Sequence, residues 1–349
     1  MSVLLPYIKR KIHFIFDLIY KRVILIGRIF KLNLYLMWPK TLYIEITNLC
    51  NANCRMCPRH DLNRQEEHMD TNLYKKIIDE ASAWFYKPKI HLVFLGEPLL
   101  HPDFIKLVIY AKSKGLVVST ISNGYAMNNE YAQALIESGL DEITFSLDSL
   151  SKKIYEQIRI GLDFDIVQKN IHNLLRLKKE LNSKTPEVQI SMVIQDLNRH
   201  EKDDFIKYWI DKVKGVYFQY EFKDFEDGGR RKINNNINKI ISERRKSCYY
   251  LDEMMVIYSS GQVTVCPADD FAEMLVGDSK LEKLLDIWRG DKYKNLRRKH
   301  MEGEYKRIKK CANCDYWRGY NVTKEEVEIG KRKLIKDANE LCENYRLKK

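Results

Sequence analysis

The sequence has 349 residues, of which 45% are hydrophobic and 31% are charged, and it carries a formal net charge of +12. This composition is typical of a globular protein and excludes a fibrous or a wholly disordered chain. The length allows one large α/β domain and a smaller one, since domains of roughly 100 to 200 residues are common.

The first segment, residues 1–40, is basic and apolar, and residues 1–49 alone carry a net charge of +6. Lys21, Arg22, Arg28 and Lys31 interrupt the apolar run before it reaches the ~20 residues that a membrane span needs. We therefore predict a helical extension that docks on the protein or on a partner, or else lies on an anionic membrane face. No secretory signal is present, so we expect a cytoplasmic protein, with peripheral contact at the membrane face as the alternative.

From residue 41 to residue 227, short β-rich runs alternate with longer amphipathic runs, which predicts parallel strands joined by crossover helices. The predicted strands are Leu42–Thr47, Lys89–Phe94, Leu116–Ile121, Glu142–Leu147, Val188–Ile194 and Val216–Phe222. The predicted helices are Asn72–Trp84, Phe104–Lys114, Asn128–Ser138, Asp165–Leu181 and Lys202–Lys212. Six such units in series fit an α/β fold of the incomplete (β/α)6 barrel type.

Three cysteines follow the first predicted strand in the pattern Cys50-x3-Cys54-x2-Cys57, with the apolar Met56 before the last one. Soft thiolate ligands select iron-sulfur clusters, zinc or cuprous copper. Three thiolates leave a fourth ligand position open, whereas a structural zinc site is closed by four protein ligands. A zinc knuckle completed by His60 or His68 is the alternative interpretation.

This motif resembles the signature of radical S-adenosylmethionine (SAM) enzymes. The resemblance implies that Cys50, Cys54 and Cys57 hold a [4Fe-4S] cluster whose fourth iron binds SAM. It also implies an external electron donor of the flavodoxin or ferredoxin type, and a 5′-deoxyadenosyl radical that removes a hydrogen atom from the substrate. The incomplete (β/α)6 barrel is the usual fold of that family, with its chemistry at the carboxyl ends of the strands.

Polar residues just past those strand ends are similar to family positions that contact SAM. The segment Leu95-Gly96-Glu97-Pro98 resembles a Gly-Gly-Glu segment, although Leu95 replaces its first glycine. The predicted SAM contacts are Gly96, Glu97, Ser122, Asn123, Ser146, Asp148 and Arg159. A general base is also expected, and the candidates by position are Glu97, Asp148, Asp269 and Asp270.

After a polar linker over residues 228–247, a second set of cysteines is predicted to form a small domain over residues 248–320. A β-hairpin is expected around the turn Ser259-Ser-Gly261, followed by a helical stretch over Leu281–Lys299. The cysteines of this set are Cys248, Cys266, Cys311 and Cys314. Their spacing resembles the twitch form of the SPASM domain, which implies one auxiliary [4Fe-4S] cluster with four protein ligands. Tyr320 and Lys324 stand where the larger SPASM form has further cysteines, and a zinc ribbon is the alternative.

The last segment, residues 321–349, is predicted to be a C-terminal helix that carries Cys342. That thiol is either a buried structural group or a donor of a hydrogen atom to a substrate radical. Together with Glu97 and Asp148, it completes the set of catalytic candidates.

The two cysteine arrays predict a radical SAM enzyme that oxidises a sugar, a cyclitol or another small or lipid-linked molecule, with the auxiliary cluster accepting an electron. Modification of a peptide or protein side chain, redox-neutral epimerisation, and a non-catalytic zinc or iron-sulfur protein are the alternatives. The basic clusters Arg230–Lys232 and Arg244–Lys246 are interpreted as solvated linker, so no nucleic acid partner is expected.

Overall fold

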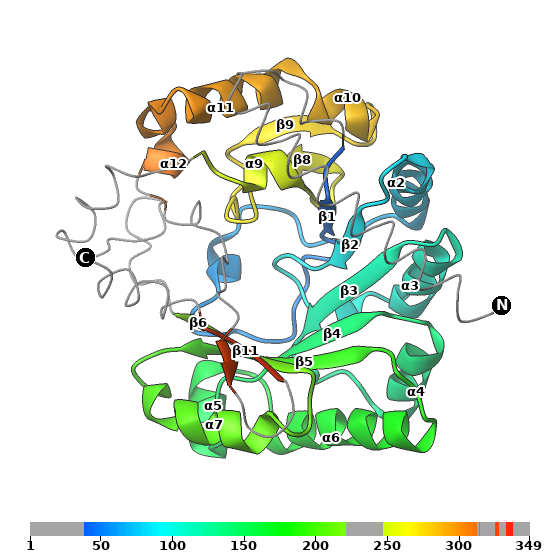
Figure 1. Cartoon of the computed structure of the whole chain (residues 1–349), viewed down its shortest axis with the longest axis vertical. Coiled ribbons are helices and arrows are strands. Elements are labelled where there is room, and N and C mark those ends of the chain that lie inside the picture. Colours follow the sequence, from blue (N-terminus) through cyan, green and yellow to red (C-terminus); the bar gives the residue numbers. More distant parts are fainter. Residues whose placement is uncertain (1–37, 221–246, 313, 315–324, 328–332, 338–349) are drawn as a thin grey trace.

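The computed structural model describes residues 38–220, 247–312, 314, 325–327 and 333–337. Its strands form one 11-stranded sheet in the order β10-β11-β6-β5-β4-β3-β2-β1-β7-β8-β9. The parallel strands β1 to β6 curve around a centre that the loop after β1 crosses (Figure 1). The predicted incomplete (β/α)6 barrel is confirmed.

The six barrel strands are close to the predicted ones. They are β1 (Thr41–Ile44), β2 (Lys89–Leu92), β3 (Val117–Ser122), β4 (Glu142–Ser146), β5 (Glu187–Ile194) and β6 (Gly215–Tyr220). Four of the predicted strands ran one to three residues too far, because polar and loop residues past the strand end still fit a β-rich pattern. The prediction for β3 ended one residue early, and that for β5 ended at the observed residue.

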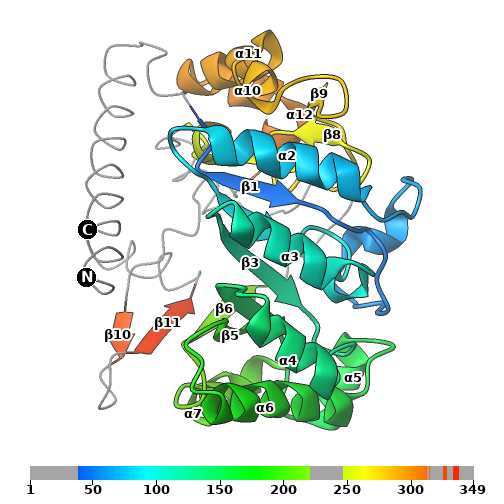
Figure 2. The same ribbon diagram turned by 90° about the vertical axis from the view of Figure 1, so that its right-hand side faces the viewer.

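The predicted crossover helices also form. They are α2 (Thr71–Ala83), α3 (Phe104–Ser113), α4 (Asn129–Glu137), α6 (Phe164–Glu180) and α7 (Lys202–Trp209). Capping side chains fix several starts: Asp70 accepts from the N–H groups of Asn72 and Leu73 before α2, and Asn128 accepts from Tyr131 before α4. Figure 2 shows α2, α3 and α4 side by side over the outer face of the sheet.

One barrel helix, α5 (Lys152–Ile158), was not predicted. It has only seven residues, too few for a helical period to stand out. Short 3-10 helices are present at η2 (Pro58–Asp61), η3 (Pro98–Leu100), η4 (Arg199–Glu201) and η6 (Glu304–Arg307).

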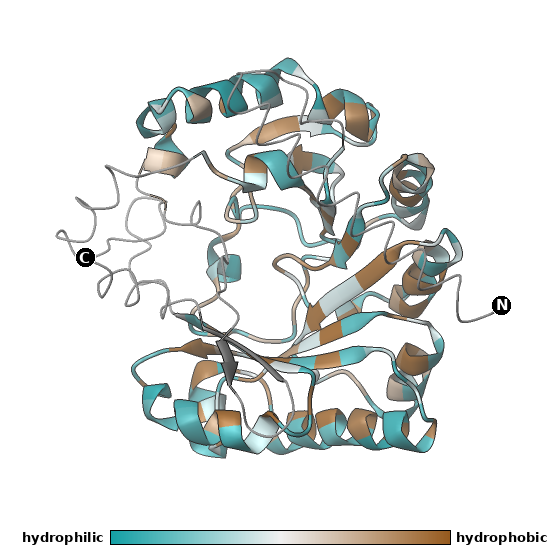
Figure 3. Ribbon diagram, viewed as in Figure 1, coloured by the Kyte–Doolittle hydropathy of each residue, from teal (hydrophilic) through white to brown (hydrophobic). Residues whose placement is uncertain are grey.

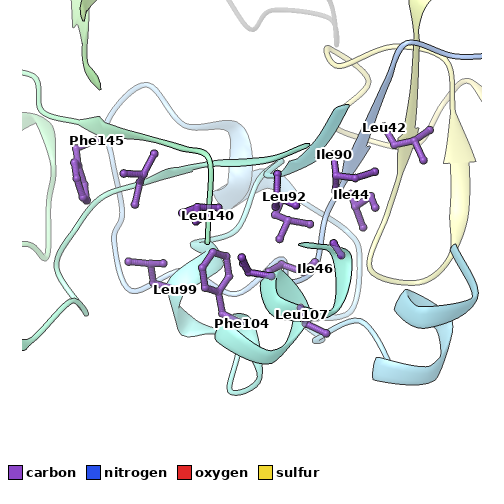
Figure 4. Packing of buried hydrophobic residues seen from close by; sticks show 14 of the residues in the cluster. Leu42, Ile44, Ile46, Ile90, Leu92, Leu99, Phe104, Leu107, Leu140 and Phe145 are labelled. Atoms are coloured by element: carbon purple, nitrogen blue, oxygen red, sulfur yellow. The ribbon is translucent and has the colours of Figure 1, made fainter. Parts of the chain in front are cut away.

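The main core lies between the sheet and these helices. Alternate residues of β1 and β2 point outward and are fully buried, as Leu42, Ile44, Ile90 and Leu92 are. Figure 4 shows these side chains meeting those of the covering helix α3, including Phe104. Apolar colour therefore concentrates on the sheet-facing sides of the helices, with hydrophilic residues outside (Figure 3).

The second part of the chain extends the barrel sheet on the β1 side. Its elements are α9 (Tyr250–Glu253), β7 (Met254–Ile257), β8 (Gln262–Thr264), β9 (Leu275–Asp278), α10 (Leu284–Trp288), α11 (Asp291–Met301) and α12 (Lys309–Ala312). The predicted hairpin is β7–β8, and β7 also pairs in parallel with β1. The predicted helical stretch is divided at Gly290 into α10 and α11. Strand β9 was not predicted.

The helix predicted over residues 321–349 is wrong at the positions that the structure describes. Residues Glu325–Val327 and Lys333–Asp337 are strands β10 and β11, and β11 pairs in parallel with β6. The unpaired edge of an incomplete barrel offers a row of N–H and C=O groups, and pairing with that edge outweighs the local helical pattern. Strands β7 and β11 thus cover the two edges of the six-stranded barrel.

Among the described helices, none is long and apolar enough to cross a membrane. The N-terminal extension up to residue 37, both basic clusters of the linker and Cys342 lie outside the described residues. The domain boundaries at 40, 227, 247 and 320 stay predictions.

Candidate functional site

The loop after β1 brings Cys50, Cys54 and Cys57 to the carboxyl end of the barrel strands. Cys54 is buried, and the other two thiols are half-buried. The backbone turns tightly here, since the N–H of Cys57 donates to the carbonyl of Cys54 at 3.0 Å. Burial raises the pKa of Cys50 to about 11, and the neighbouring charges of Glu97 and Cys54 add to the rise. Cys54 likewise adds to the burial effect that raises the pKa of Cys57, so the three thiols lie near one another.

Backbone contacts hold this loop against the end of α5. The N–H of Asn53 donates to the carbonyl of Ile160 at 2.8 Å, and the N–H of Arg55 donates to that of Ile158 at 2.9 Å. Gly161 follows with a φ of +93°, and a Cβ there would lie 3.4 Å from the carbonyl oxygen of Asn51. These backbone contacts therefore help to set the course of the loop.

A buried ion pair reaches one of the thiols. Arg159, at the end of α5, donates from Nε to Asp148 Oδ2 at 2.5 Å and from Nη1 to Cys54 Sγ at 3.5 Å. Asp148 is fully buried, and its other oxygen accepts from the N–H of Val193 at 2.7 Å. Asn198 fixes the backbone there by donating to the carbonyl of Asp148 at 2.7 Å. The orientation of Arg159 is thus set by β4 and β5.

On the opposite side, the segment after β2 packs directly on the residues that lead to Cys50. The N–H of Glu97 donates to the carbonyl of Leu49 at 2.8 Å. A Cβ on Gly96 would lie 2.1 Å from the carbonyl oxygen of Thr47, which no side chain tolerates. The single glycine of Leu95-Gly96-Glu97 is therefore required by this close backbone approach.

The carboxylate of Glu97 joins the ends of β2 and β3. It accepts from Ser122 Oγ at 2.7 Å and from the N–H groups of Asn123 at 2.7 Å and Leu99 at 3.1 Å. Burial raises the pKa of Glu97 in spite of these bonds. Asn123 donates in turn to the side chain of Asn51 at 2.9 Å, inside the cysteine loop.

The structure therefore brings six of the seven predicted SAM contacts around the loop of Cys50. Gly96, Glu97, Ser122 and Asn123 form one side, and the pair of Asp148 and Arg159 forms the other. Ser146 lies at the end of β4, half-buried, opposite Ser191 of β5.

The four later cysteines come together from distant segments. Cys248 precedes α9, Cys266 follows β8, Cys311 lies in α12, and Cys314 follows it. Burial raises the pKa of Cys248 to about 12, with further contributions from Cys314 and Cys311. The pKa of Cys266 is also raised, first by burial and then by the other three thiols. The charges of the other three thiols thus reach Cys266, which places the four cysteines in one region of the structure.

Asp269 organises the loop after Cys266. Its fully buried carboxylate accepts from Thr264 Oγ1 at 2.7 Å and from the N–H groups of Glu273 and Met274 at 2.9 and 2.8 Å. Its N–H donates to the carbonyl of Cys266 at 3.1 Å. Asp270, the neighbouring base candidate, is buried as well.

An ion pair that sequence reasoning missed connects the two cysteine sites. Arg64 donates to both oxygens of the fully buried Glu45, at 2.6 and 2.8 Å, and its guanidinium lies 4.4 Å from the ring centroid of Tyr258. The hydroxyl of Tyr258 donates to the carbonyl of Asp269. A charged residue inside the apolar run Thr41–Thr47 was the available signal, because a buried carboxylate needs a partner.

The thiol sets fit iron-sulfur clusters by the chemistry of their donors. Of the alternative zinc ligands, His60 lies on η2, and the ring of His68 lies 5.1 Å from that of His101. Among the described residues, no three His, Cys, Asp or Glu side chains are placed to hold a single metal ion.

Two family models match the chain. The model of the radical SAM superfamily matches residues 44–208, and the model of the SPASM iron-sulfur cluster-binding domain matches residues 248–315. This chain belongs to the radical SAM superfamily. Its radical SAM domain is followed by a SPASM domain, and these two domains bind SAM and iron-sulfur clusters, as the motifs predicted.

Two relatives show how far the sequence likeness extends. A tungsten-containing aldehyde ferredoxin oxidoreductase cofactor-modifying protein of Pyrococcus furiosus is 28% identical over 48% of this chain and 48% of its own length. An S-adenosyl-L-methionine-dependent 2-deoxy-scyllo-inosamine dehydrogenase of Niallia circulans is 24% identical over 78% of this chain and 91% of its own length. The chain spans about half the length of the first relative and between 45% and 74% of the length of the GTP 3′,8-cyclases it matches.

Solved structures share the fold. SuiB of Streptococcus suis bound to S-adenosylmethionine superposes with a TM-score of 0.60 at 16% identity, covering 75% of this chain and 68% of that chain. The enzyme anSMEcpe with bound AdoMet superposes with a TM-score of 0.59 at 16% identity, covering 88% of this chain and 94% of that chain. BtrN in complex with AdoMet and 2-DOIA gives a TM-score of 0.52 at 18% identity, covering 80% and 93%.

Proposed function

We propose that this protein cleaves SAM reductively and oxidises a polar small molecule, such as a sugar or a cyclitol. The observation that carries the proposal is the gathering of two thiol sets, three cysteines at the open end of the barrel and four in the SPASM domain. When bound, the open cluster and SAM supply a 5′-deoxyadenosyl radical that removes a hydrogen atom, and the auxiliary cluster accepts an electron from the substrate.

The protein residues act by position and charge in this proposal. The backbone of Gly96 and Glu97 lies against the residues that lead to Cys50, where the N–H of Glu97 donates to the carbonyl of Leu49. Arg159, oriented by Asp148, offers a planar cation to the carboxylate of SAM beside Cys54. Ser122 and Asn123 are tied to Glu97 and hold the end of β3, and Ser146 at the end of β4 completes the predicted set.

The carboxylates considered as a general base have other bonds. Both oxygens of Glu97, of Asp148 and of Asp269 accept hydrogen bonds or an ion pair from protein groups. These bonds favour positioning roles for all three. Cys342 stays a candidate donor of a hydrogen atom.

Oxidation of an alcohol is favoured by one relative above all. The inosamine dehydrogenase matches along 91% of its length, whereas the cyclases match over 45% to 74% of theirs. Peptide modification is the second candidate, since SuiB, one of whose structures is bound to its precursor peptide SuiA, shares the fold. We further propose a cytoplasmic location and a flavodoxin-like or ferredoxin-like electron donor; membrane contact through residues 1–40 stays a prediction.

Iron content and SAM cleavage test the proposal. Anaerobically reconstituted protein should hold about eight irons and form 5′-deoxyadenosine, and a Cys50→Ala/Cys54→Ala/Cys57→Ala variant should hold about four irons and form none. A Cys311→Ala/Cys314→Ala variant is the matched control, which should lose the auxiliary cluster and keep some SAM cleavage. Zinc in the wild type without SAM cleavage would contradict the proposal.

The redox outcome separates oxidation from epimerisation. With a deuterated cyclitol or sugar substrate, oxidation should move deuterium into 5′-deoxyadenosine and yield a carbonyl product. A product of unchanged oxidation state with solvent hydrogen at the same carbon would favour epimerisation. In that case Cys342→Ala should abolish product formation and keep deuterium transfer.

A further inference from the structure

Positive charge is concentrated in one segment of the described chain. Residues 289–310 contain ten Lys and Arg against three acidic residues, a net charge of +7. Residues 50–288, which include nearly the whole barrel, contain 33 basic and 36 acidic residues, a net charge of −3. The segment therefore differs in sign from the domain that it sits beside, and it leads directly into Cys311.

Seven of these side chains are exposed, and six of them, on three adjoining elements, form what we call the basic surface. They are Lys292, Lys294 and Arg298 on α11, Lys306 and Arg307 on η6, and Lys309 on α12. The helix α11 contacts η6, and η6 contacts α12, so the three elements form one continuous surface. Figure 1 shows α11 and α12 at the end of the molecule opposite α5 and α6.

Two basic residues of the segment have structural roles and are not part of this surface. Arg297 is buried and donates to the carbonyls of Leu251 and Trp288, both at 2.8 Å. Lys310 pairs with Glu273 at 2.5 Å. The six exposed cations have no comparable role in the fold.

Acidic neighbours neutralise the basic surface only in part. Lys294 pairs with Asp291 at 3.7 Å, Arg298 with Glu302 at 2.6 Å and Arg307 with Glu304 at 2.9 Å. No ion pair among the described residues includes Lys292, Lys306 or Lys309. Exposed pairs one helical turn apart are weak, so an incoming anionic partner can exchange with them at little cost.

The basic surface lies next to the SPASM cysteines. Lys309 and Cys311 share α12, and the N–H of Cys311 donates to the carbonyl of Ile308 at 2.8 Å, between η6 and that helix. Cys266, Cys311 and Cys314 are half-buried, whereas Cys248 of the same set is buried. A protein seated on α11, η6 and α12 would thus lie over the side of this site that carries Cys311.

We propose that the basic surface is the docking site of an acidic one-electron carrier protein of the flavodoxin or ferredoxin class, which exchanges an electron with the auxiliary cluster. In the reducing direction, the carrier's reduced cofactor would lose one electron, which would pass through the auxiliary cluster to the cluster of Cys50, Cys54 and Cys57 that cleaves SAM. No bond forms or breaks in this transfer, and the auxiliary cluster is left oxidised and able to accept the substrate's electron. This inference rests on the proposed function for the presence of that cluster. Complementary charge steers such encounters and fixes their orientation.

Two other anionic partners fit the observations less well. A lipid surface is bound by basic residues together with inserted Trp, Phe or Leu side chains. Within residues 289–310, the exposed large hydrophobic residue is Met301 alone, at 36% exposure. A nucleic acid would match the positive charge, but it would not account for the position of this surface beside the SPASM cysteines.

The test compares two charge-reversal variants of the full-length reconstituted protein. The first is Lys292→Glu/Lys306→Glu/Arg307→Glu on the basic surface. The control is Lys153→Glu/Lys169→Glu/Lys184→Glu, three exposed lysines in and after α5 and α6 with the same change in net charge. Iron content confirms that both variants keep their clusters. The probe is a purified acidic flavodoxin.

The readouts are the flavodoxin dissociation constant at about 50 mM and about 300 mM NaCl, and the rate of SAM cleavage with reduced flavodoxin or with photoreduced 5-deazariboflavin. We expect the first variant to bind flavodoxin roughly tenfold or more weakly and to lose most of the salt dependence. Its SAM cleavage should fall with flavodoxin and stay unchanged with deazariboflavin. The control should match the wild type.

Equal binding by both variants, or equal loss in both, would overturn the docking site. Wild-type binding to anionic vesicles or duplex DNA that only the first variant loses, without flavodoxin binding, would assign the surface to that partner instead. Failure of SAM cleavage with deazariboflavin in the wild type would count against the proposed function, while the flavodoxin affinities would still decide the docking site.

Discussion

The loop of Cys50, Cys54 and Cys57 takes its shape from backbone contacts, whereas buried side chains bring the four SPASM cysteines together. The first set lies within eight residues and is pressed between Gly96 and the end of α5. The second set spans residues 248–314 and depends on groups such as Asp269 and Arg297. The cysteines that are close in sequence are held by tight backbone packing. The cysteines from distant segments are held by hydrogen bonds of side chains that join those segments.

The largest effect is expected from a substitution at Gly96, where the backbone packing beside the cysteine loop leaves no space for a side chain. Gly96→Ala places a methyl group 2.1 Å from the carbonyl oxygen of Thr47, so the strand end and the cysteine loop must separate. We expect a loss of at least about 3 kcal/mol in the free energy of unfolding and a loss of iron from the first site. Anaerobic denaturation and iron analysis measure both.

The matched control is Gly303→Ala. This glycine has a φ of +76° and no atom within 4 Å of its would-be Cβ, so only backbone strain of about 1 kcal/mol is expected. Equal losses for the two variants would show that close packing at Gly96 is not what shapes the loop.

A smaller loss is expected from Asp148→Asn. Arg159 would then keep a largely buried charge without its ionic partner, which costs about 3 kcal/mol. The guanidinium would also lose its orientation toward Cys54, so SAM cleavage should slow and the EPR spectrum of the first cluster should change. Glu180→Gln breaks the exposed pair with Arg176 and should alter stability by less than about 0.5 kcal/mol. An unchanged EPR spectrum and full SAM cleavage in the Asp148→Asn variant would rule out a role of Asp148 in orienting Arg159.

The second site is probed by Asp269→Asn. One carboxylate oxygen becomes an amide donor facing N–H and O–H donors, so we expect a loss of about 2 kcal/mol and poor iron retention in the SPASM domain. SAM cleavage should persist, because Cys50, Cys54 and Cys57 are held separately. The control is Asp278→Asn, since the carboxylate of Asp278 accepts a single described hydrogen bond, from the N–H of Lys280. Equal loss of iron from both sites would show that the two cysteine sites are not held independently of each other.

The smallest effect is a pH dependence of barrel stability. Burial, helped by the charge of Lys89, lowers the pKa of His91 to about 4, while its Nδ1 lies 2.7 Å from Ser119 Oγ. In the unfolded chain the imidazole of His91 is protonated near pH 6.5, whereas in the folded chain it stays neutral down to about pH 4. The free energy of unfolding therefore falls as the pH drops from about 6.5 toward 4. Because the side chain keeps some exposure, we expect about 1 kcal/mol at pH 5.5.

His91→Gln should flatten this dependence, and the exposed His200→Gln should not. The measurement is urea denaturation of each protein at pH 7.5 and pH 5.5. If the free energy of unfolding changes equally between the two pH values in His91→Gln and in the wild type, the assignment to His91 is wrong.

The periodic parts of the fold could be predicted from the sequence, and the long-range pairings could not. The barrel strands and their covering helices follow from hydrophobic alternation, and the two cysteine sets follow from their spacing. The pairing of β7 with β1 joins residues more than 200 positions apart, and nothing local encodes it. The edge strand β11 was mistaken for a helix for the same reason.

The site shows the same division. Gly96, Glu97 and Asp148 could be placed because the ends of parallel strands meet at one face. The bond from Arg159 to Cys54 depends on a seven-residue helix that the pattern did not reveal. The ion pair of Glu45 and Arg64 was missed because a side-chain partner 19 residues away leaves no period in the sequence.

The two strands that cover the barrel edges come late in the chain, and this bears on synthesis. The ribosome releases β1 to β6 before β7, and β11 emerges last of all. Until then both edges of the nascent sheet are open to other chains. We expect a product that terminates before residue 250 to keep all six barrel strands, to leave both sheet edges exposed, and therefore to aggregate more readily than the longer chain.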